Sequence, residues 1–377
     1  MKILVASDSF KGTFSSLEVA GLIEKGVKRA MPEAEVRSVP VADGGEGTVD
    51  AIVQACGGEY IDVPVHGPLG DTVTARYGIT GDGTAVIEMS AASGICLVPR
   101  EKLNPLLAST YGTGELVIDA INRGCKKIII GIGGSATNDG GTGFARAIGV
   151  KLLDANGNEL DGTGEAARRV HAVQTQGIDK RLKDIEILVA CDVDNPLCGE
   201  KGASAVFGPQ KGATPEMVAL LDKNLRNYSE AVARATGRDI ASEPGMGAAG
   251  GLGFSILQYC NARTGKGIEI VLDTIGFDAY ASWADIVITG EGRVDFQTPY
   301  GKTPAGVAKR AGKYGKPVYA IAGFEGKGAQ AIYDCGIAEV VSAVYAPCTI
   351  DEAIAASGEN IPRAAERLMR IIKPFLR

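Results

Sequence analysis

The stretch KILVASDSFKG at residues 2–12, followed by the pattern SSLE at residues 15–18, decides the fold class. Its apolar start is typical of a short buried strand, and SSLE is a capping box that begins a helix, which Pro32 ends. A second strand is predicted at residues 35–39 and a second helix at residues 46–55. This alternation of strands and helices predicts a parallel sheet with helices on both faces.

The rest of the chain predicts a second domain inserted into the first. Residues 60–89 show alternating strands separated by glycine turns, which indicate a small antiparallel insertion. The strand–helix alternation resumes from residue 283. We therefore expect one discontinuous α/β domain built from both ends of the chain, with a second α/β domain inserted. The first would comprise residues 1–60, about 100–149 and 283–377, and the second about 61–99 and 150–282.

Composition excludes several classes of function. The net charge of −6 argues against long nucleic acid as a partner. No apolar run reaches the roughly 20 residues of a membrane span, and no leader precedes the first strand, so we expect a cytoplasmic protein. The 8 cysteines form no C-x-x-C pair, which suits a reducing compartment. With only His66 and His171 available, proton transfer would fall to a carboxylate or a lysine.

Two acidic segments follow the first two predicted strands. DSFKGT at residues 8–13 offers a carboxylate, hydroxyls and a lysine ahead of a helix N-terminus, where anions are stabilised. DGGEGT at residues 43–48 has adjacent glycines that let the backbone approach a ligand. In open α/β sheets ligands bind beyond the carboxyl ends of the strands, so both segments are candidate site residues. A capped loop and an ordinary helix start are the competing interpretations.

The most glycine-rich loop, GIGGSATNDGGTG, spans residues 131–143 after a clear strand. Gly131, Gly133 and Ala136 fit a variant of the dinucleotide fingerprint, and Asp154 lies near the expected distance. Glycines recur, however, where the dinucleotide helix should already run, at a cost of about 1 kcal/mol each. We therefore expect a longer loop that presents backbone N–H groups to phosphate or carboxylate oxygens.

Three further segments carry candidate chemistry. CDVDNPL at residues 191–197 follows a strand and offers a general base or oxygen ligands for a metal, although a plain turn would also explain it. TGEGRVD at residues 289–295 runs on to Gly-Lys-Thr at residues 301–303, but Phe296 stands where a P-loop needs glycine, so we reject a P-loop. GMGAAGGLG at residues 245–253 lacks a preceding strand, and we expect a phosphate-contacting loop. The single lysine of the turn at residues 207–212 is a weak signal.

In combination, these segments closely resemble the type I glycerate kinases of bacteria. The matching stretches are DSFKG, DGGEGT, IGGSATNDGG, CDVDNPL, GMGAAGG and GEGRVD, and the resemblance extends over essentially the whole chain. The resemblance implies ATP- and Mg²⁺-dependent phosphorylation of D-glycerate, which bacterial members usually convert to 2-phosphoglycerate. It also implies a flavodoxin-like parallel-sheet domain that carries an inserted α/β domain with a mixed sheet.

The roles of individual residues are our own inference from phosphoryl-transfer chemistry. We expect Asp192 to accept the hydroxyl proton of glycerate, Lys11 to neutralise the transferring phosphoryl group, and Asp43 and Asp295 to hold Mg²⁺. Arg293 could pair with the glycerate carboxylate. The remaining candidates for binding substrate or phosphate are Asp8, Ser9, Gly44, Gly45, Gly133, Gly134, Ser135, Asn138, Asp139, Asn195, Gly247, Gly250, Gly251 and Glu291.

Two functions of other classes stay open at this point. The fingerprint at Gly131 supports an NAD-dependent dehydrogenase of a small hydroxy acid, and mere turns at the acidic loops would suit a non-catalytic metabolite-binding module. The expected partners are D-glycerate and ATP, without nucleic acid or membrane. The sequence leaves the oligomeric state, the regiochemistry and the loop that binds adenine undetermined.

Overall fold

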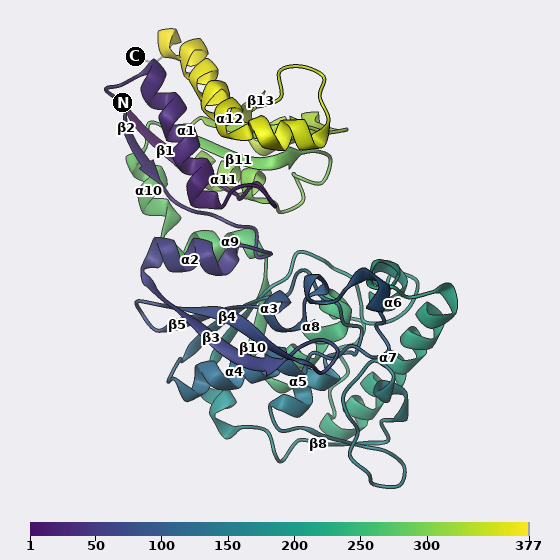
Figure 1. Ribbon diagram of the computed structural model, residues 1–377. Coiled ribbons are helices and arrows are strands. Elements are labelled where there is room, and N and C mark those ends of the chain that lie inside the picture. The colour runs from purple at the N-terminus through teal and green to yellow at the C-terminus, as the bar shows by residue number, and fades with distance from the viewer. Residues whose placement is uncertain (376–377) are drawn as a thin grey trace. The chain divides into compact units, whose positions relative to one another are not determined.

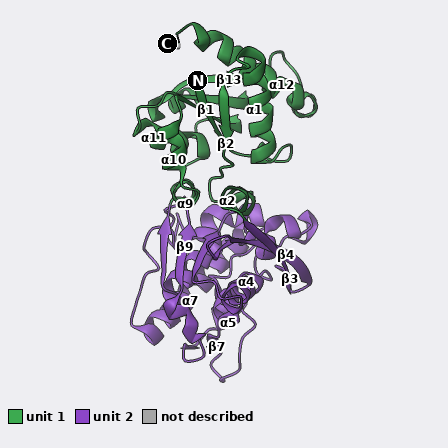
Figure 2. Ribbon diagram, turned by 90° about the vertical axis from the view of Figure 1, so that its left-hand side faces the viewer, with its two compact units in different colours: residues 1–57, 266–377 green, residues 58–265 purple. Residues whose placement is uncertain are grey.

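The computed structural model describes residues 1–375, and the chain forms two compact units (Figure 2). Unit 1 comprises residues 1–57 and the described residues from 266 onward. Unit 2 comprises residues 58–265. Unit 2 is thus a continuous insertion that the chain enters once and leaves once.

Unit 1 contains a five-stranded parallel sheet in the order β13-β12-β11-β1-β2. Counted along the chain this is the flavodoxin order 2-1-3-4-5, so the predicted flavodoxin-like domain is confirmed. The strands are β1 (Lys2–Ser7), β2 (Glu35–Ser38), β11 (Ile286–Val294), β12 (Val318–Glu325) and β13 (Ile337–Ser342). The helices are α1 (Ser16–Ala30), α2 (Thr48–Cys56), α9 (Gly267–Thr274), α10 (Phe277–Trp283), α11 (Thr303–Gly312) and α12 (Ile350–Ile372).

Helices α1 and α12 cover one face of this sheet, and α10 and α11 cover the other (Figures 1 and 2). The predicted capping box begins α1: the Glu18 carboxylate accepts from the Ser15 backbone N–H at 2.8 Å, and Ser15 Oγ accepts from the Glu18 N–H. Helix α1 packs closely on α12, since a Cβ at Gly26 would lie 2.1 Å from the Pro362 carbonyl oxygen. Only glycine permits this approach of two helix backbones.

Unit 2 contains a six-stranded mixed sheet in the order β10-β9-β6-β5-β4-β3. The four strands from β10 to β5 are parallel, whereas β4 and β3 pair antiparallel. The strands are β3 (Gly58–His66), β4 (Thr72–Thr80), β5 (Thr84–Glu88), β6 (Lys127–Gly131), β9 (Glu186–Ala190) and β10 (Ala262–Gly265), with β7 (Lys151–Leu153) and β8 (Ala172–Gln174) in a separate pair. The helices are α3 (Ser90–Ser93), α4 (Tyr111–Asn122), α5 (Thr142–Ala147), α6 (Ala203–Phe207), α7 (Pro215–Thr236) and α8 (Leu252–Tyr259).

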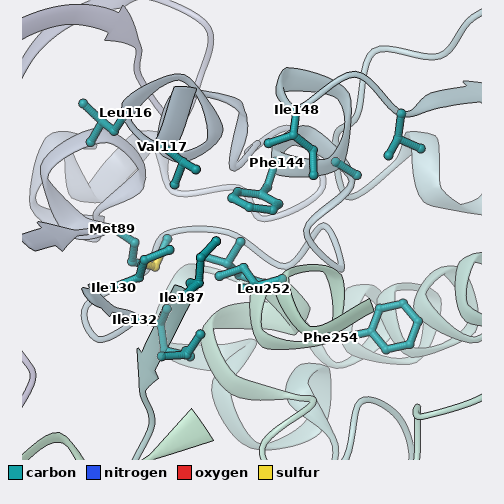
Figure 3. Packing of buried hydrophobic residues seen from close by; sticks show 14 of the residues in the cluster. Met89, Leu116, Val117, Ile130, Ile132, Phe144, Ile148, Ile187, Leu252 and Phe254 are labelled. Atoms are coloured by element: carbon teal, nitrogen blue, oxygen red, sulfur yellow. The ribbon is translucent and has the colours of Figure 1, made fainter. Parts of the chain in front are cut away.

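The core of unit 2 lies between its sheet and helices that include α5 and α8. Ile130 and Ile187 from the sheet belong to one buried cluster with Phe144 of α5 and Leu252 of α8 (Figure 3). This packing anchors both ends of the loop that follows β6.

The domain boundaries differ from those predicted. Residues 100–149 lie in unit 2, because β6 pairs with β5 on one side and β9 on the other. Residues 266–282, which form most of α9 and α10, lie in unit 1, where the two helices pack on each other and on α11. The predicted mixed sheet of the inserted domain is confirmed. Across residues 1–375, none of the helices combines the length and apolarity that crossing a membrane requires.

Candidate functional site

Unit 1 has a cavity of about 640 Å³ at the carboxyl edge of its sheet. In the flavodoxin order the chain switches sides between β1 and β11, and a ligand crevice is expected where those strands end. Ser7 is the last residue of β1 and pairs with Gly290 of β11, so Asp8 follows the end of β1 at the level of Glu291, where β11 continues beyond β1. Both line the cavity, with Ser9, Lys11, Asp43 and Arg293. Six sequence-predicted residues are therefore brought together.

Asp8 is a buried carboxylate with a fixed orientation. One oxygen accepts from the Ser9 N–H at 2.7 Å, and the other accepts from the Thr303 hydroxyl at 2.7 Å. Burial and the negative charge of Asp43 raise the pKa of Asp8 to about 7, although Thr303 and Lys11 oppose the rise. The charged form of Asp8 is therefore disfavoured, and a nearby cation would stabilise it.

Glu291 is the second buried carboxylate of the cavity. It accepts from the Thr298 hydroxyl, and its other oxygen lies 3.7 Å from the ammonium group of Lys302. Burial raises the pKa of Glu291 to about 7, while Thr298 and Lys302 lower it and Asp43 adds to the rise. Burial is thus the main cause of the raised pKa of both Asp8 and Glu291, and the charge of Asp43 adds to both shifts.

Lys11 supplies a positive charge to this group of acids. Burial lowers the pKa of Lys11, but the negative charges of Asp43, Asp8, Glu46 and Glu291 outweigh it, so the pKa is raised overall. Lys11 is therefore charged at neutral pH. Its surroundings hold an excess of negative charge, which suits a site that also binds a cation.

The loop of Asp43 is packed tightly against α9. The Gly45 N–H donates to the Asp43 carboxylate at 3.1 Å, and a Cβ at Gly267 would lie 2.0 Å from the Asp43 carbonyl oxygen and also crowd Gly44. Gly45 thus holds the Asp43 carboxylate, and Gly44 belongs to the backbone that packs against α9.

Asp295, predicted as a metal ligand, has a different environment. It is buried, and its carboxylate accepts from the Gln297 N–H at 2.9 Å and pairs with Arg293 at 2.8 Å. Asp295 does not belong to the residues that line the cavity, whereas Arg293 does. This pairing argues against Asp295 as a ligand and gives it the role of orienting the guanidinium group of Arg293.

The donors of unit 1 fit a loosely held magnesium ion. Among residues 1–375, no group of three or more His, Cys, Asp or Glu side chains is arranged to hold a metal by itself. Asp8 and Asp43 nevertheless supply oxygen donors whose charges act on each other. Two carboxylates suffice for Mg²⁺, which keeps several waters and shares the oxygens of phosphate groups.

Unit 2 presents a second group of candidates after β6 and β9. Gly131, Ala190 and Gly265 are in register across β6, β9 and β10, so the loops that follow start from one edge of the sheet. Gly133 and Gly134 are exposed in the first loop, and Asp192 is exposed in the second. The loops at this edge therefore place two glycines and an aspartate at the surface of unit 2.

Ser135 is joined to a buried lysine. The Lys211 ammonium group, 1% exposed, donates to Ser135 Oγ at 2.7 Å and to the Thr137 carbonyl oxygen at 2.6 Å. Burial lowers the pKa of Lys211 to about 7, although Asp139 opposes the shift. Lys211 belongs to the turn that gave only a weak signal in the sequence.

Asp139 holds the loop rather than facing solvent. Its buried carboxylate accepts from the backbone and hydroxyl of Thr110 at 2.9 and 2.7 Å and from the N–H groups of Gly141 and Gly143 at 3.0 and 3.2 Å. Burial raises the pKa of Asp139 against these hydrogen bonds. The loop is therefore tied to the start of α4 and of α5.

Two amide side chains, both predicted as binding residues, are engaged within unit 2. Asn138 donates to the Ser204 hydroxyl at 2.8 Å, and its buried Oδ1 has no hydrogen-bond partner. Asn195 donates to the Lys201 carbonyl oxygen at 2.7 Å. Asn195 thus closes its own loop.

The glycines of residues 245–251 pack against other loops. A Cβ at Gly250 would lie 2.0 Å from the Thr137 carbonyl oxygen, one at Gly247 2.3 Å from that of Pro196, and one at Gly251 2.6 Å from Gly140 Cα. All three are buried, and the Gly140 N–H donates to the Gly250 carbonyl oxygen at 2.9 Å. Their geometry supports the loop after β6 and does not expose them to a phosphate.

The segment that matched the dinucleotide fingerprint does not adopt the dinucleotide-binding arrangement of a strand, a short turn and a helix. The Asp154 carboxylate accepts from the N–H groups of Asn156 and Asn158 at 2.8 and 2.9 Å, within its own turn. It follows β7, which pairs only with β8 among the described strands. Helix α5 starts at Thr142, well beyond the end of β6. This geometry removes the basis for an NAD-dependent dehydrogenase.

The sequence analysis assigned no role to three residues that make polar contacts with the candidate residues: Thr303, Lys302 and Lys211. Thr303 and Lys302 belong to the rejected P-loop match, and they contact Asp8 and Glu291 without forming a P-loop. For Lys302 and Thr303 the available signal was a lysine and a hydroxyl at the start of a helix that follows a strand.

The environment of Lys211 leads to a pH-dependent stability. The folded-state pKa of about 7 lies below the ordinary 10.5, so between these values the unfolded chain binds a proton that the folded chain lacks. Stability should therefore rise with pH from about 7 to about 10, by at most about 1.4 kcal/mol per pH unit.

We expect urea unfolding at pH 7 and pH 9 to show this rise in the parent and to lose it in Lys211→Met. Lys223→Met, at an exposed lysine of α7, is the matched control. Equal pH dependence in the parent and in Lys211→Met would contradict the assignment.

Comparisons with known proteins place these features in a family. The model of the "Glycerate kinase family" matches residues 3–373. The glycerate kinase of Bacillus subtilis (strain 168) is 49% identical over 374 residues, which cover 99% of this chain and 98% of that protein. The glycerate 2-kinase of Escherichia coli (strain K12) is 48% identical over 369 residues, or 98% and 97% of the two chains.

The fold agrees as well. A solved structure described as glycerate kinase 2 from Salmonella typhimurium LT2 superposes with a TM-score of 0.90 at 46% identity, covering 100% of this chain and 99% of that one. Because sequence and fold both match over nearly the full length of both partners, this chain belongs to the glycerate kinase family.

Proposed function

We propose that this protein transfers the terminal phosphoryl group of ATP to a hydroxyl group of D-glycerate and releases ADP and 2-phosphoglycerate. The full-length family match carries the proposal, since a kinase family implies ATP as co-substrate. The 2-position is supported by the similarity to the Escherichia coli glycerate 2-kinase.

The residues of unit 1 are assigned to the phosphate groups. Lys11 would neutralise charge on the transferring phosphoryl group, and Arg293, oriented by Asp295, would pair with an anionic oxygen. Asp43 and Asp8 would hold Mg²⁺, which when bound supplies charge neutralisation to phosphate oxygens. Thr303 keeps the Asp8 carboxylate oriented toward that task.

The residues of unit 2 are assigned to glycerate. The backbone N–H groups of the exposed Gly133 and Gly134, and the Ser135 hydroxyl that Lys211 holds, would suit the substrate carboxylate. Asp192 would accept the hydroxyl proton while the substrate oxygen bonds to phosphorus and the bond to ADP breaks. Asp139 and the glycines at 247, 250 and 251 keep the loop in shape.

Measurement of ADP release tests the function. We expect turnover with Mg²⁺-ATP and D-glycerate, much less with L-glycerate, and none above the ATP-hydrolysis background without acceptor. Phosphorus NMR of the product should show 2-phosphoglycerate. ATP binding without ADP release on any hydroxy acid would instead favour a non-catalytic metabolite-binding module.

A further inference from the structure

The cavity of unit 1 is divided into a charged part and an apolar part. The charged part contains Asp8 and Lys11 after β1, Asp43 after β2, and Glu291 of β11. The apolar part includes Phe324 of β12, Val344 after β13, and Ile350 and Ile354 of α12. The volume of about 640 Å³ lies within the usual range for small-molecule sites of roughly 300–1,000 Å³.

The apolar part gathers large apolar side chains that are exposed in one cavity. Phe324 is 38% exposed, Ile350 72% and Ile354 45%, and all three line the same cavity. The Arg293 guanidinium group lies 5.7 Å from the centre of the Phe324 ring, where the two parts meet. A ligand with one flat apolar end, and one anionic end that carries a divalent cation to the acids, is complementary to this arrangement.

The N-terminus of α12 borders the apolar part, but its capping leaves little room for an anion. The Glu352 carboxylate accepts from the Thr349 N–H at 2.8 Å and from its hydroxyl at 3.1 Å, and the Thr349 hydroxyl accepts from the Glu352 N–H. A carboxylate thus already occupies the positive end of this helix. Phosphate groups therefore belong at the Lys11 end of the cavity.

We propose that the purine base of ATP binds in the apolar part of the unit 1 cavity, between Phe324 and the Ile350–Ile354 turn of α12. The phosphate chain then points past Arg293 toward Lys11 and the acids that would hold Mg²⁺. This inference rests on the proposed function for the identity of the nucleotide, and it assigns the adenine site that the sequence left undetermined.

Cys348 offers a direct readout, because it is exposed and lines the same cavity. Cys96, the other exposed cysteine, lies in unit 2 and is the internal control. We expect ATP without glycerate to slow alkylation of Cys348 by iodoacetamide at least fivefold, as measured by peptide mass spectrometry, and to leave Cys96 unchanged. Adenosine should protect at higher concentration, and tripolyphosphate should not.

Protection by tripolyphosphate but not by adenosine, or equal protection of Cys348 and Cys96, would overturn the assignment. The experiment distinguishes a wrong function from a wrong nucleotide site. If ATP protects Cys348 but no ADP is released with glycerate, the proposed reaction is wrong and the nucleotide site stands. If ADP is released with glycerate but ATP does not protect Cys348, the proposed nucleotide site is wrong and the reaction stands.

A variant pair provides a second test by equilibrium binding of ATP. Ile354→Ala should raise the Kd for ATP roughly tenfold, because it removes apolar contact with the base from a half-exposed position. Ile371→Ala changes a residue that is 61% exposed near the other end of α12, and it should leave the Kd unchanged. Equal affinity of ATP for both variants would refute the proposed base site.

Discussion

Replacing Lys11 by Met should lower kcat roughly 10²–10³-fold at saturating D-glycerate and Mg²⁺-ATP. Lys11 is surrounded by Asp43, Asp8, Glu46 and Glu291, and its charge lowers the pKa of Asp8. Without Lys11, the nearby carboxylates would repel the negative charge of the transferring phosphoryl group, because one of the cations that balances this charge would be missing. The remaining acids would also bind protons more readily, so the acid limb of the kcat–pH profile should move to higher pH.

The control for this prediction is Lys313→Met, which removes the same charge at an exposed position after α11. Lys11→Arg should recover part of the activity, since it restores a cation with different hydrogen-bond geometry. A fall in kcat of less than tenfold in Lys11→Met, with an unchanged pH profile, would exclude Lys11 from the phosphoryl site.

Replacing Asp192 by Asn should lower kcat by about 10²–10⁴-fold, the usual effect of removing a general base. The Kd for ATP should stay the same, because the proposed nucleotide site belongs to unit 1. Stopped-flow or coupled ADP-release measurements at saturating substrates would give the value. Asp194→Asn is the matched control, since this aspartate is exposed in the same loop two residues later.

A loss of less than tenfold in Asp192→Asn would move the base to another carboxylate. Asp8 and Glu291 are then the alternatives, because their pKa values of about 7 suit proton transfer at neutral pH. Asp8→Asn and Glu291→Gln would distinguish them by which one removes the acid limb of the kcat–pH profile.

The sequence predicted the unit 1 site from a simple rule. Acids and glycines that follow parallel strands gather at one edge, so Asp8, Asp43 and Glu291 could be grouped without knowing the strand order. The capping box at Ser15 was equally local, because all its hydrogen bonds lie within four residues.

Features that depend on distant contacts could not be predicted in this way. The run Ile128–Ile130 is the same whether β6 pairs within unit 1 or unit 2, and only its long-range partners decide the domain. Likewise, the sequence does not show whether a glycine makes room for a ligand or for another part of the backbone. Gly250 looked like a ligand-binding glycine, but it makes room for the backbone of Thr137. Lys211 gave no periodic signal, since its burial comes from the fold around it.

The insertion of unit 2 between β2 and β11 has a consequence for synthesis on the ribosome. Strand β1, with Ile3, Leu4 and Val5 fully buried in the finished sheet, pairs with β11 some 283 residues later, as in Ile3 with Ile286. At roughly 5–20 residues per second, β1 waits on the order of tens of seconds for this neighbour, while all of unit 2 is already available to fold. The nascent chain can pair β1 with β2 along one edge, but the other edge of β1 lacks its partner for that interval, which exposes unit 1 to mispairing.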